Sequence, residues 1–276
     1  MSYYEMAKTA AEYIMSKCSK APELVLVLGS GLGDYAEQIE NPTIIPYPDI
    51  PGFKTSTVKG HAGRLVIGEL FGVNVAIMQG RIHYYEGYTQ QEITLPIRSL
   101  KLCGANTVLF TNASGGIDRS FVPGDLMMID DHINLSGKSP LMGPNEDEFG
   151  HRFPDMAKAY DKELKQVLLD AAQKADVDLK RGVYIMFNGP QFETGAEINF
   201  ARIIGAHAVG MSTVPEVIAA RHAGMRIAAV SCITNMAAGI LDQPITHSEV
   251  NETAAKAKVK FTALVNEFVK GVADLV

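Results

Sequence analysis

Short apolar runs that end in glycine or in polar residues recur along the chain and predict buried β-strands. The clearest is Leu24–Leu28, five aliphatic residues in a row followed by Gly29, which is typical of a strand buried on both faces. Leu65–Leu70 and Val73–Met78 flank Phe71-Gly72 and predict a hairpin. Further strands are predicted at residues 107–110, 126–130, 183–187, 208–211 and 227–232.

Helical spacing of apolar residues alternates with these runs. Ser2 and Glu5 match a capping box, and apolar residues between Met156 and Ala171 recur at the spacing of one helix face. Residues 41–51 hold four prolines and are predicted to form a loop. This alternation predicts an α/β fold with a mixed sheet, in a single domain that spans residues 1–276. Three more helix starts are predicted from capping-box spacing: Thr194 with Glu197, Thr213 with Glu216, and Thr246 with Glu249.

Composition and charge exclude several classes of protein. Lys and Arg number 25 against 31 for Asp and Glu, and this difference of 25 − 31 = −6 argues against nucleic-acid binding, which needs basic side chains to neutralise phosphates. A small anion could still bind in a local basic pocket. No apolar run approaches the roughly 18 residues of a membrane span, and no signal peptide is visible, so a cytoplasmic protein without a membrane partner is expected.

Cysteine and histidine patterns predict neither a disulfide framework nor a metal site. Cys18, Cys103 and Cys232 lie far apart, and the 7 histidines show no metal-ligand spacing. The adjacent Arg221 and His222, inside a predicted helix, are interpreted as structural or solvated rather than catalytic.

Polar clusters directly follow many of the predicted strands. In open α/β sheets, ligands bind outside the carboxyl ends of the strands, so these clusters are expected to converge on one site. The clusters are Gly29–Gly33, Gly80–His83, Thr111–Gly116, Asn188–Glu193, Ser212-Thr213 and Thr234-Asn235.

The first of these clusters, Gly29–Gly33, departs from the spacing of a dinucleotide-binding loop. Two interpretations remain: a tight strand-to-helix turn, or a cradle in which free N–H groups and the Ser30 hydroxyl hold a small oxyanion. Arg81 and His83 lie two residues apart and would share a face of an extended segment. Because an Arg fork binds phosphate bidentately, and His83 and His61 could add donors, these side chains are candidate anion ligands. Taken alone, each histidine is more often structural than a ligand.

Glu193 and Asn235 suggest recognition of a flat heterocycle. A carboxylate accepts donated protons, and an amide both donates and accepts. Together they suit a 6-oxopurine, with N1–H toward Glu193 and with N7 and O6 toward Asn235, while Phe192 offers a flat apolar face. The alternative for Glu193 is an ordinary carboxylate at a helix start.

Taken together, these motifs resemble the trimeric purine nucleoside phosphorylases. The match runs in order from about residue 24 to 250 and covers nearly the whole chain. The motifs that carry it are Gly29–Gly33, Gly60–Arg64, Gly80–Tyr88, Thr111–Ala113, Gly189–Thr194, Gly210–Glu216 and Thr234-Asn235.

The resemblance implies a fold, an assembly and a reaction. The fold would be a single α/β domain with a central mixed, partly barrel-like sheet flanked by helices. The assembly would be a homotrimer with active sites near the subunit interfaces. The reaction would be the reversible phosphorolysis of purine ribo- or deoxyribonucleosides to free base and pentose 1-phosphate, in purine catabolism and salvage. Inorganic phosphate would be a co-substrate, with no cofactor or metal.

The resemblance also implies roles for individual residues. Those expected to act in catalysis are Asn235, Glu193 and His83. The phosphate ligands would be Ser30, His61, Arg81, His83, the backbone N–H of Ala113, and Ser212. The purine pocket would be formed by Phe192, Glu193, Met211 and Asn235. The ribose contacts would be Tyr85, Met211 and His247, joined by Phe153 from a neighbouring subunit.

Related and unrelated alternatives are weighed against this assignment. Methylthioadenosine phosphorylases share the fold, but Asp would meet a 6-amino base better than Asn235, and an apolar residue would meet a 5′-methylthio group better than His247. Ser114 stands where relatives have Ala, which affects only fine phosphate-loop geometry. A nicotinamide-dependent oxidoreductase is disfavoured by the failed glycine spacing and a missing acidic residue. A silent binding scaffold should lack Glu193, Asn235 or the phosphate ligands.

Overall fold

The described strands form one mixed sheet that closes on itself at one end. The computed structural model describes residues 1–58, 60–241 and 247–276, with the backbone alone for 247–251. The strand order is β2-β3-β4-β1-β5-β8-β7-β6-β9, and β5 also pairs with β9 in parallel. The second half of the sheet is therefore a closed ring, which confirms the expectation of a partly barrel-like sheet. The strands are β1 (Leu24–Leu28), β2 (Thr43–Pro46), β3 (Arg64–Leu70), β4 (Val73–Gln79), β5 (Thr107–Gly116), β6 (Leu126–Asn134), β7 (Leu179–Met186), β8 (Ala208–Gly210) and β9 (Arg226–Met236).

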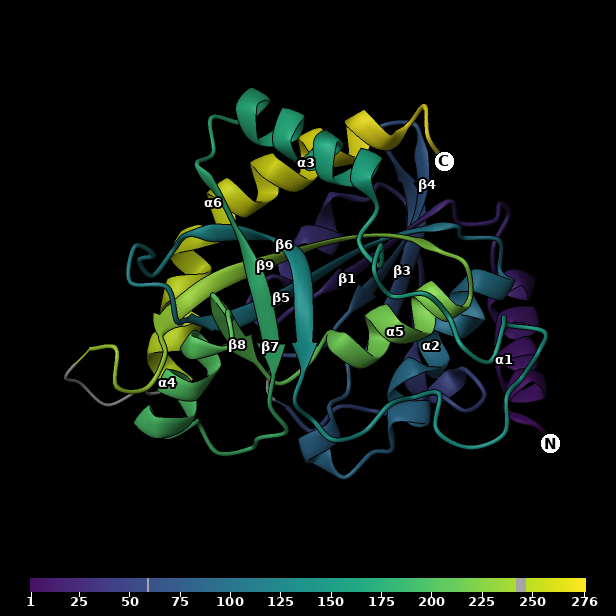
Figure 1. Cartoon of the computed structure of the whole chain (residues 1–276). Helices are drawn as coiled ribbons and strands as arrows, with labels where there is room; N and C mark the ends of the chain where they lie inside the picture. The colour runs from purple at the N-terminus through teal and green to yellow at the C-terminus, as the bar shows by residue number, and fades with distance from the viewer. Residues whose placement is uncertain (59, 242–246) are drawn as a thin grey trace.

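Helices cover both faces of this sheet (Figure 1). Strand β1 shows why both faces need cover, because Val25 and Val27 join the core beneath α1, α2 and α5, while Leu24, Leu26 and Leu28 join the core beneath α3 and α6. The run of five aliphatic residues thus predicted its own two-sided burial. The helices are α1 (Tyr3–Lys17), α2 (Gln90–Leu102), α3 (Lys162–Lys174), α4 (Gly195–Ile203), α5 (Val214–His222) and α6 (His247–Val272).

Two predictions about element boundaries are wrong. Residues 41–51 are not only loop, because Thr43–Pro46 forms β2, antiparallel to β3 at the edge of the sheet. An edge strand needs hydrogen bonds on one side only and therefore tolerates proline. The helix predicted from Met156 begins at Lys162 instead, where the Asp161 carboxylate accepts the N–H groups of the first turn. The helix start predicted at Thr246 lies outside the described residues.

Strands β5 and β9 are longer than their apolar runs suggested. Thr111–Gly116 and Thr234-Asn235, predicted to follow the strands, lie inside them. The two strands pair in parallel over this polar stretch, with an irregularity at Ser114 and Gly115. Polar residues at the carboxyl ends of these strands are thereby held by the sheet itself. Within the described residues, no helix is long and apolar enough to cross a membrane.

Candidate active site

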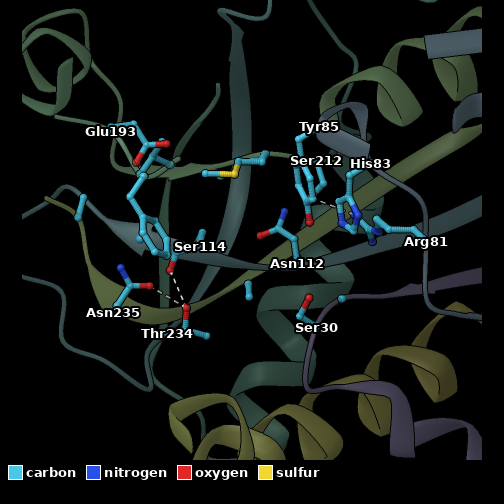
Figure 2. Close-up of a pocket in the computed structure, with 18 of the residues that line it drawn as sticks. Ser30, Arg81, His83, Tyr85, Asn112, Ser114, Glu193, Ser212, Thr234 and Asn235 are labelled. Atoms are coloured by element: carbon cyan, nitrogen blue, oxygen red, sulfur yellow. Dashed lines mark hydrogen bonds between the residues drawn. The ribbon is translucent and has the colours of Figure 1, made fainter. Parts of the chain in front are cut away.

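One cavity collects the polar clusters at the carboxyl ends of β1, β4, β5, β8 and β9. In Figure 2, Glu193 and Asn235 lie toward one end of it, and Arg81 and His83 lie toward the other. The structure thus brings together the described residues that the sequence nominated, apart from Phe153. The nominated residues that line the cavity are Ser30, His61, Arg81, His83, Tyr85, Ala113, Phe192, Glu193, Met211, Ser212 and Asn235.

Arg81 is held by a buried carboxylate. Its guanidinium is 3% exposed and lies 3.2 Å from Glu216 Oε2, whose side chain is 1% exposed. Arg81 also donates to the Thr213 hydroxyl at 3.0 Å and to the Thr111 carbonyl at 2.5 Å. Its Nε has no partner among the described residues. The charge is therefore fixed in place, with one N–H left to donate.

Glu216 was predicted only as the cap of α5. It does accept the backbone N–H of Thr213 at 3.2 Å, and the same oxygen pairs with Arg81. Thr213 itself has a left-handed backbone, with φ of 71°, which is uncommon for a β-branched residue. The capping-box spacing was the only sequence signal for this pairing, and it does not specify the Arg partner.

His61 is a neutral donor aimed at Ser30. Its Nδ1 accepts the backbone N–H of Arg81 at 2.7 Å. Burial, then the nearby His83 and Arg81, lower the pKa of His61 to about 3. The neutral ring must therefore carry its proton on Nε2, which lies 3.0 Å from the Ser30 hydroxyl.

His83 is oriented by Glu86, which the sequence reasoning missed. Its Nδ1 lies 2.8 Å from Glu86 Oε1, and its ring stacks on Tyr85 with centroids 4.8 Å apart. Burial alone would raise the pKa of Glu86, but hydrogen bonds from His83 and Thr57 outweigh it and lower that pKa to about 2. The ionised carboxylate thus holds the proton on His83 Nδ1. The available signal was the three-residue spacing between His83 and Glu86.

The other end of the cavity offers a carboxylate and an amide. Glu193 is 9% exposed, its Oε1 has no partner among the described residues, and burial raises its pKa. Asn235 Oδ1 accepts the Thr234 hydroxyl at 3.0 Å, and Nδ2 donates to the Met236 carbonyl at 3.0 Å. Because an amide carries two N–H donors, one remains for another acceptor.

The loop after β1 is the tight turn of the first interpretation of its glycines, and the oxyanion cradle stays a prediction. The Gly29 N–H is not free, since it donates to the Thr111 hydroxyl at 3.1 Å. A Cβ at Gly29 would lie 2.6 Å from the Asn112 Cα, so only glycine fits there. The loop is therefore a tight turn that leads into a short 3-10 helix, Gly33–Gln38. Ser30 still lines the cavity.

Two nominated residues are not among the described residues that line the cavity. Phe153 does not line it and is 89% exposed. His247 begins α6, but its side chain lies outside the described part of the structure. Arg221 and His222, interpreted as structural or solvated, do not line the cavity either. Across the described residues, no group of three or more His, Cys, Asp or Glu side chains could hold a metal ion.

Similarity to known proteins agrees with this geometry. Residues 23–270 match the family model of the phosphorylase superfamily. The chain is 53% identical over 264 residues to purine nucleoside phosphorylase 1 of Geobacillus stearothermophilus, covering 96% of each chain. It is 44% identical over 272 residues to purine nucleoside phosphorylase of Rattus norvegicus, covering 95% of this chain and 93% of the relative.

Solved structures give the same result. Isoform 2 of the Schistosoma mansoni purine nucleoside phosphorylase, in complex with cytosine and ribose-1-phosphate, has a TM-score of 0.92 at 44% identity, covering 97% of this chain and 96% of that one. The Schistosoma mansoni enzyme in complex with inosine has a TM-score of 0.91 at 37% identity, covering 96% of both chains. The chain therefore belongs to the purine nucleoside phosphorylases, within the phosphorylase superfamily.

Proposed function

We propose that this purine nucleoside phosphorylase acts on 6-oxopurine nucleosides such as inosine and guanosine. It transfers their ribose or deoxyribose reversibly to inorganic phosphate and releases the free base. The observation that carries the proposal is the two-ended cavity, with Arg81 and His83 at one end and Glu193 and Asn235 at the other (Figure 2). A nucleoside laid between these ends would bring phosphate to one side of the glycosidic bond and hold the base on the other.

The end of the cavity that holds Arg81 and His83 binds the phosphate through hydrogen-bond donors. Its donors would be the Arg81 guanidinium, His61 Nε2–H, His83, the hydroxyls of Ser30 and Ser212, and the backbone N–H of Ala113. Glu216 holds Arg81 through a contact of 3.2 Å. Glu86 holds His83 through a contact of 2.8 Å. Because these donors are already oriented, they would not need to reorganise as the phosphate attacks C1′.

The other end stabilises the leaving purine. Cleavage of the glycosidic bond develops positive charge on the sugar and negative charge on the base. Asn235 donates to N7, and this hydrogen bond strengthens as negative charge develops on the base. One such donor stabilises the transition state by roughly 2.7–4 kcal/mol. Glu193 accepts N1–H, which favours a 6-oxopurine, because the N1 of adenine carries no hydrogen. Phe192 and Met211 pack against the rings.

The ribose contacts and the assembly complete the proposal. Tyr85 and Met211 line the cavity and would contact the sugar, and His247 is assigned to the 5′-hydroxyl on the resemblance alone. Phe153 would close the site of a neighbouring subunit in a homotrimer. Its 89% exposure supports this role, since an aromatic ring left in water gains no burial energy within its own chain. We also propose cytoplasmic action without a metal or organic cofactor.

Turnover of four nucleosides tests the specificity. A Schistosoma mansoni relative has been crystallised with adenosine, so binding alone would not discriminate between the bases. We expect phosphate-dependent kcat/KM for inosine and guanosine to exceed that for adenosine and methylthioadenosine by about 100-fold or more. Equal turnover of adenosine would overturn the assignment of Asn235 and Glu193, and preference for methylthioadenosine would also overturn that of His247.

A further inference from the structure

Residues 135–161, which join β6 to α3, form a long connecting segment that carries Phe153. In Figure 1 this segment runs from the end of β6 past α5, α2 and α1 before it returns to α3. Connections this long inside a compact domain are usually functional. Two phenylalanines in it have opposite environments, because Phe149 is 6% exposed and Phe153 is 89% exposed. The buried ring therefore anchors a segment that displays the exposed one.

Phe149 packs against a buried cation. The Arg98 guanidinium carbon lies 4.3 Å from the centroid of its ring, and Tyr4 packs on the ring at 5.2 Å between centroids. Arg98 lies on α2, is 2% exposed, and no salt bridge joins it to a carboxylate within the described part of the chain. Burial lowers the pKa of Arg98, and the charge of the Glu146 carboxylate, on the connecting segment, acts in the opposite direction. Burying a charge that no close salt bridge pairs is costly, so the contacts that Arg98 does make are informative. Arg98 contacts Phe149 of this segment, Tyr3 of α1 and His222 of α5.

His222, the last residue of α5, completes the contact. Its Nδ1 lies 3.1 Å from Arg98 Nη2. Burial, then the charge of Arg98, lower the pKa of His222, so the neutral ring can accept this hydrogen bond. Gly150 rests directly on His222, since a Cβ at Gly150 would lie 2.2 Å from the His222 carbonyl oxygen. The segment thus approaches α5 at a distance that only glycine permits.

Further contacts tie the segment down on both sides of Phe153. Before it, the Tyr3 N–H donates to Glu146 Oε1 at 3.0 Å. After it, Arg221 Nε donates to the Asp155 carbonyl at 3.0 Å. The backbone around Phe153 is therefore fixed at its two ends while the ring stays in solvent.

We propose that Arg98 and His222 are positioning residues that clamp residues 146–155, so that Phe153 is presented in one fixed place to the nucleoside site of a neighbouring subunit. The inference rests on the role proposed for Phe153 and goes beyond it by assigning the residues that set its position. Fixing the segment before the nucleoside arrives removes the entropy cost of ordering it upon binding. It also gives a reason for burying a guanidinium that makes no salt bridge within the described part of the chain and whose favourable charge interaction is with Glu146 of this same segment.

Steady-state kinetics of single and double variants test this clamp. Gly150→Ala pushes the segment off α5 without removing any charge, and Arg98→Met removes the cation at similar length. We expect each to raise KM for inosine about tenfold, the scale of a modest misplacement, while KM for phosphate stays unchanged. Arg98→Lys keeps the charge but loses the planar fork, so its effect should be smaller. Glu148→Ala, on an exposed position of the same segment, is the matched control.

The decisive comparison adds Phe153→Ala. If the clamp acts through Phe153, Gly150→Ala and Arg98→Met have no further effect on inosine KM in that background. Fold-changes that multiply independently would overturn the clamp while leaving the role of Phe153 intact. A Phe153→Ala protein with normal inosine KM would overturn that role and the clamp together. A rise in the KM for phosphate that matches the rise in the KM for inosine would also overturn the clamp. If Gly150→Ala does not fold, Arg98→Met with and without Phe153→Ala decides by the same criteria.

Discussion

The backbone N–H of Arg81 donates to Nδ1 of His61 at 2.7 Å, and this contact decides which ring nitrogen faces Ser30. A segment that positions the main cation of the cavity therefore also sets the tautomer of its neighbour. Both residues line the same cavity, and hydrogen bonds hold both side chains in place. Glu216 also serves two neighbours with one atom. Its Oε2 accepts the Thr213 N–H at the start of α5 and pairs with Arg81.

The first prediction concerns the protonation of His61. Because the pKa of His61 is lowered from 6.5 to about 3, its ring should stay neutral and Nε2-protonated between about pH 5 and 8. Nitrogen-15 NMR of labelled histidine measures the tautomer directly. Titration of His61 within that range would contradict the account. Since the folded state resists protonation, wild-type stability should fall as pH drops from 6.5 toward 3, and His61→Asn should flatten that fall.

The second prediction concerns Glu86. Its replacement by Gln removes the carboxylate that orients His83, so KM for phosphate should rise about tenfold, the equivalent of one lost charge-assisted hydrogen bond of roughly 1.4 kcal/mol. The pKa of Glu86 is lowered from 4.5 to about 2, so its stabilising effect is complete above pH 4.5 and is lost as pH falls toward 2.

Denaturant unfolding at several pH values checks the Glu86 linkage. Wild type should lose more stability than Glu86→Gln as the pH drops from 4.5 to 2, the window set by the usual and the lowered pKa of Glu86. Glu92→Gln removes a carboxylate that caps a helix away from the cavity, so it is the control for activity and should leave the KM for phosphate unchanged. Because hydrogen bonds from Thr89 also lower the pKa of Glu92, the acid unfolding curve of this variant should likewise be flatter than that of wild type. Parallel acid unfolding curves for wild type and Glu86→Gln would show that the carboxylate is not held as described.

The third prediction is that replacing Glu193 raises the stability of the protein and lowers its activity. Burial raises the pKa of this carboxyl, so ionising it costs stability as pH rises from 4.5 through the raised value. Glu193→Gln cannot ionise and should therefore melt at a higher temperature than wild type at neutral pH, with the difference vanishing in acid. The same change removes the acceptor for N1–H and should lower kcat/KM for inosine by about 10- to 100-fold. A variant that is active and no more stable would refute the role of Glu193.

The fourth prediction concerns the amide at position 235. Asn235→Ala should lower kcat for inosine by about 10² to 10³-fold, because a transition-state donor is lost. Asn235→Asp should raise the ratio of adenosine to inosine turnover, since a carboxylate accepts from a 6-amino group. Coupled assays of base release measure both variants, and near-normal inosine turnover by Asn235→Ala would be incompatible with its assigned role.

Apolar patterning predicted the strands well wherever both faces are buried. Leu24–Leu28 became β1 with its side chains divided between two cores. The pattern failed where strands carry polar side chains, because Asn112, Ser114 and Thr234 line a cavity from inside β5 and β9. The four prolines led to the prediction of a loop where β2 forms. An edge strand tolerates proline because the backbone on its open side needs no partner strand.

The residues that line the cavity were easier to nominate than the residues that hold them. Arg81 and Glu193 follow strands, and Asn235 lies near the carboxyl end of β9, so their convergence at one edge of the sheet could be expected. Glu216 reads as an ordinary helix cap until its buried partner Arg81 is placed beside it. His222 looked structural, and its contact with Arg98, distant in sequence, becomes visible only in the fold.

The most direct test of the central claim is the fate of the ribose when inosine is cleaved. Phosphorus-31 NMR with inosine and inorganic phosphate should show one ribose 1-phosphate formed for each hypoxanthine released, and no base should be released when phosphate is omitted. Hypoxanthine release that is independent of phosphate and yields free ribose would contradict the account, because Arg81, His83 and Ser30 would then bind no reacting phosphate.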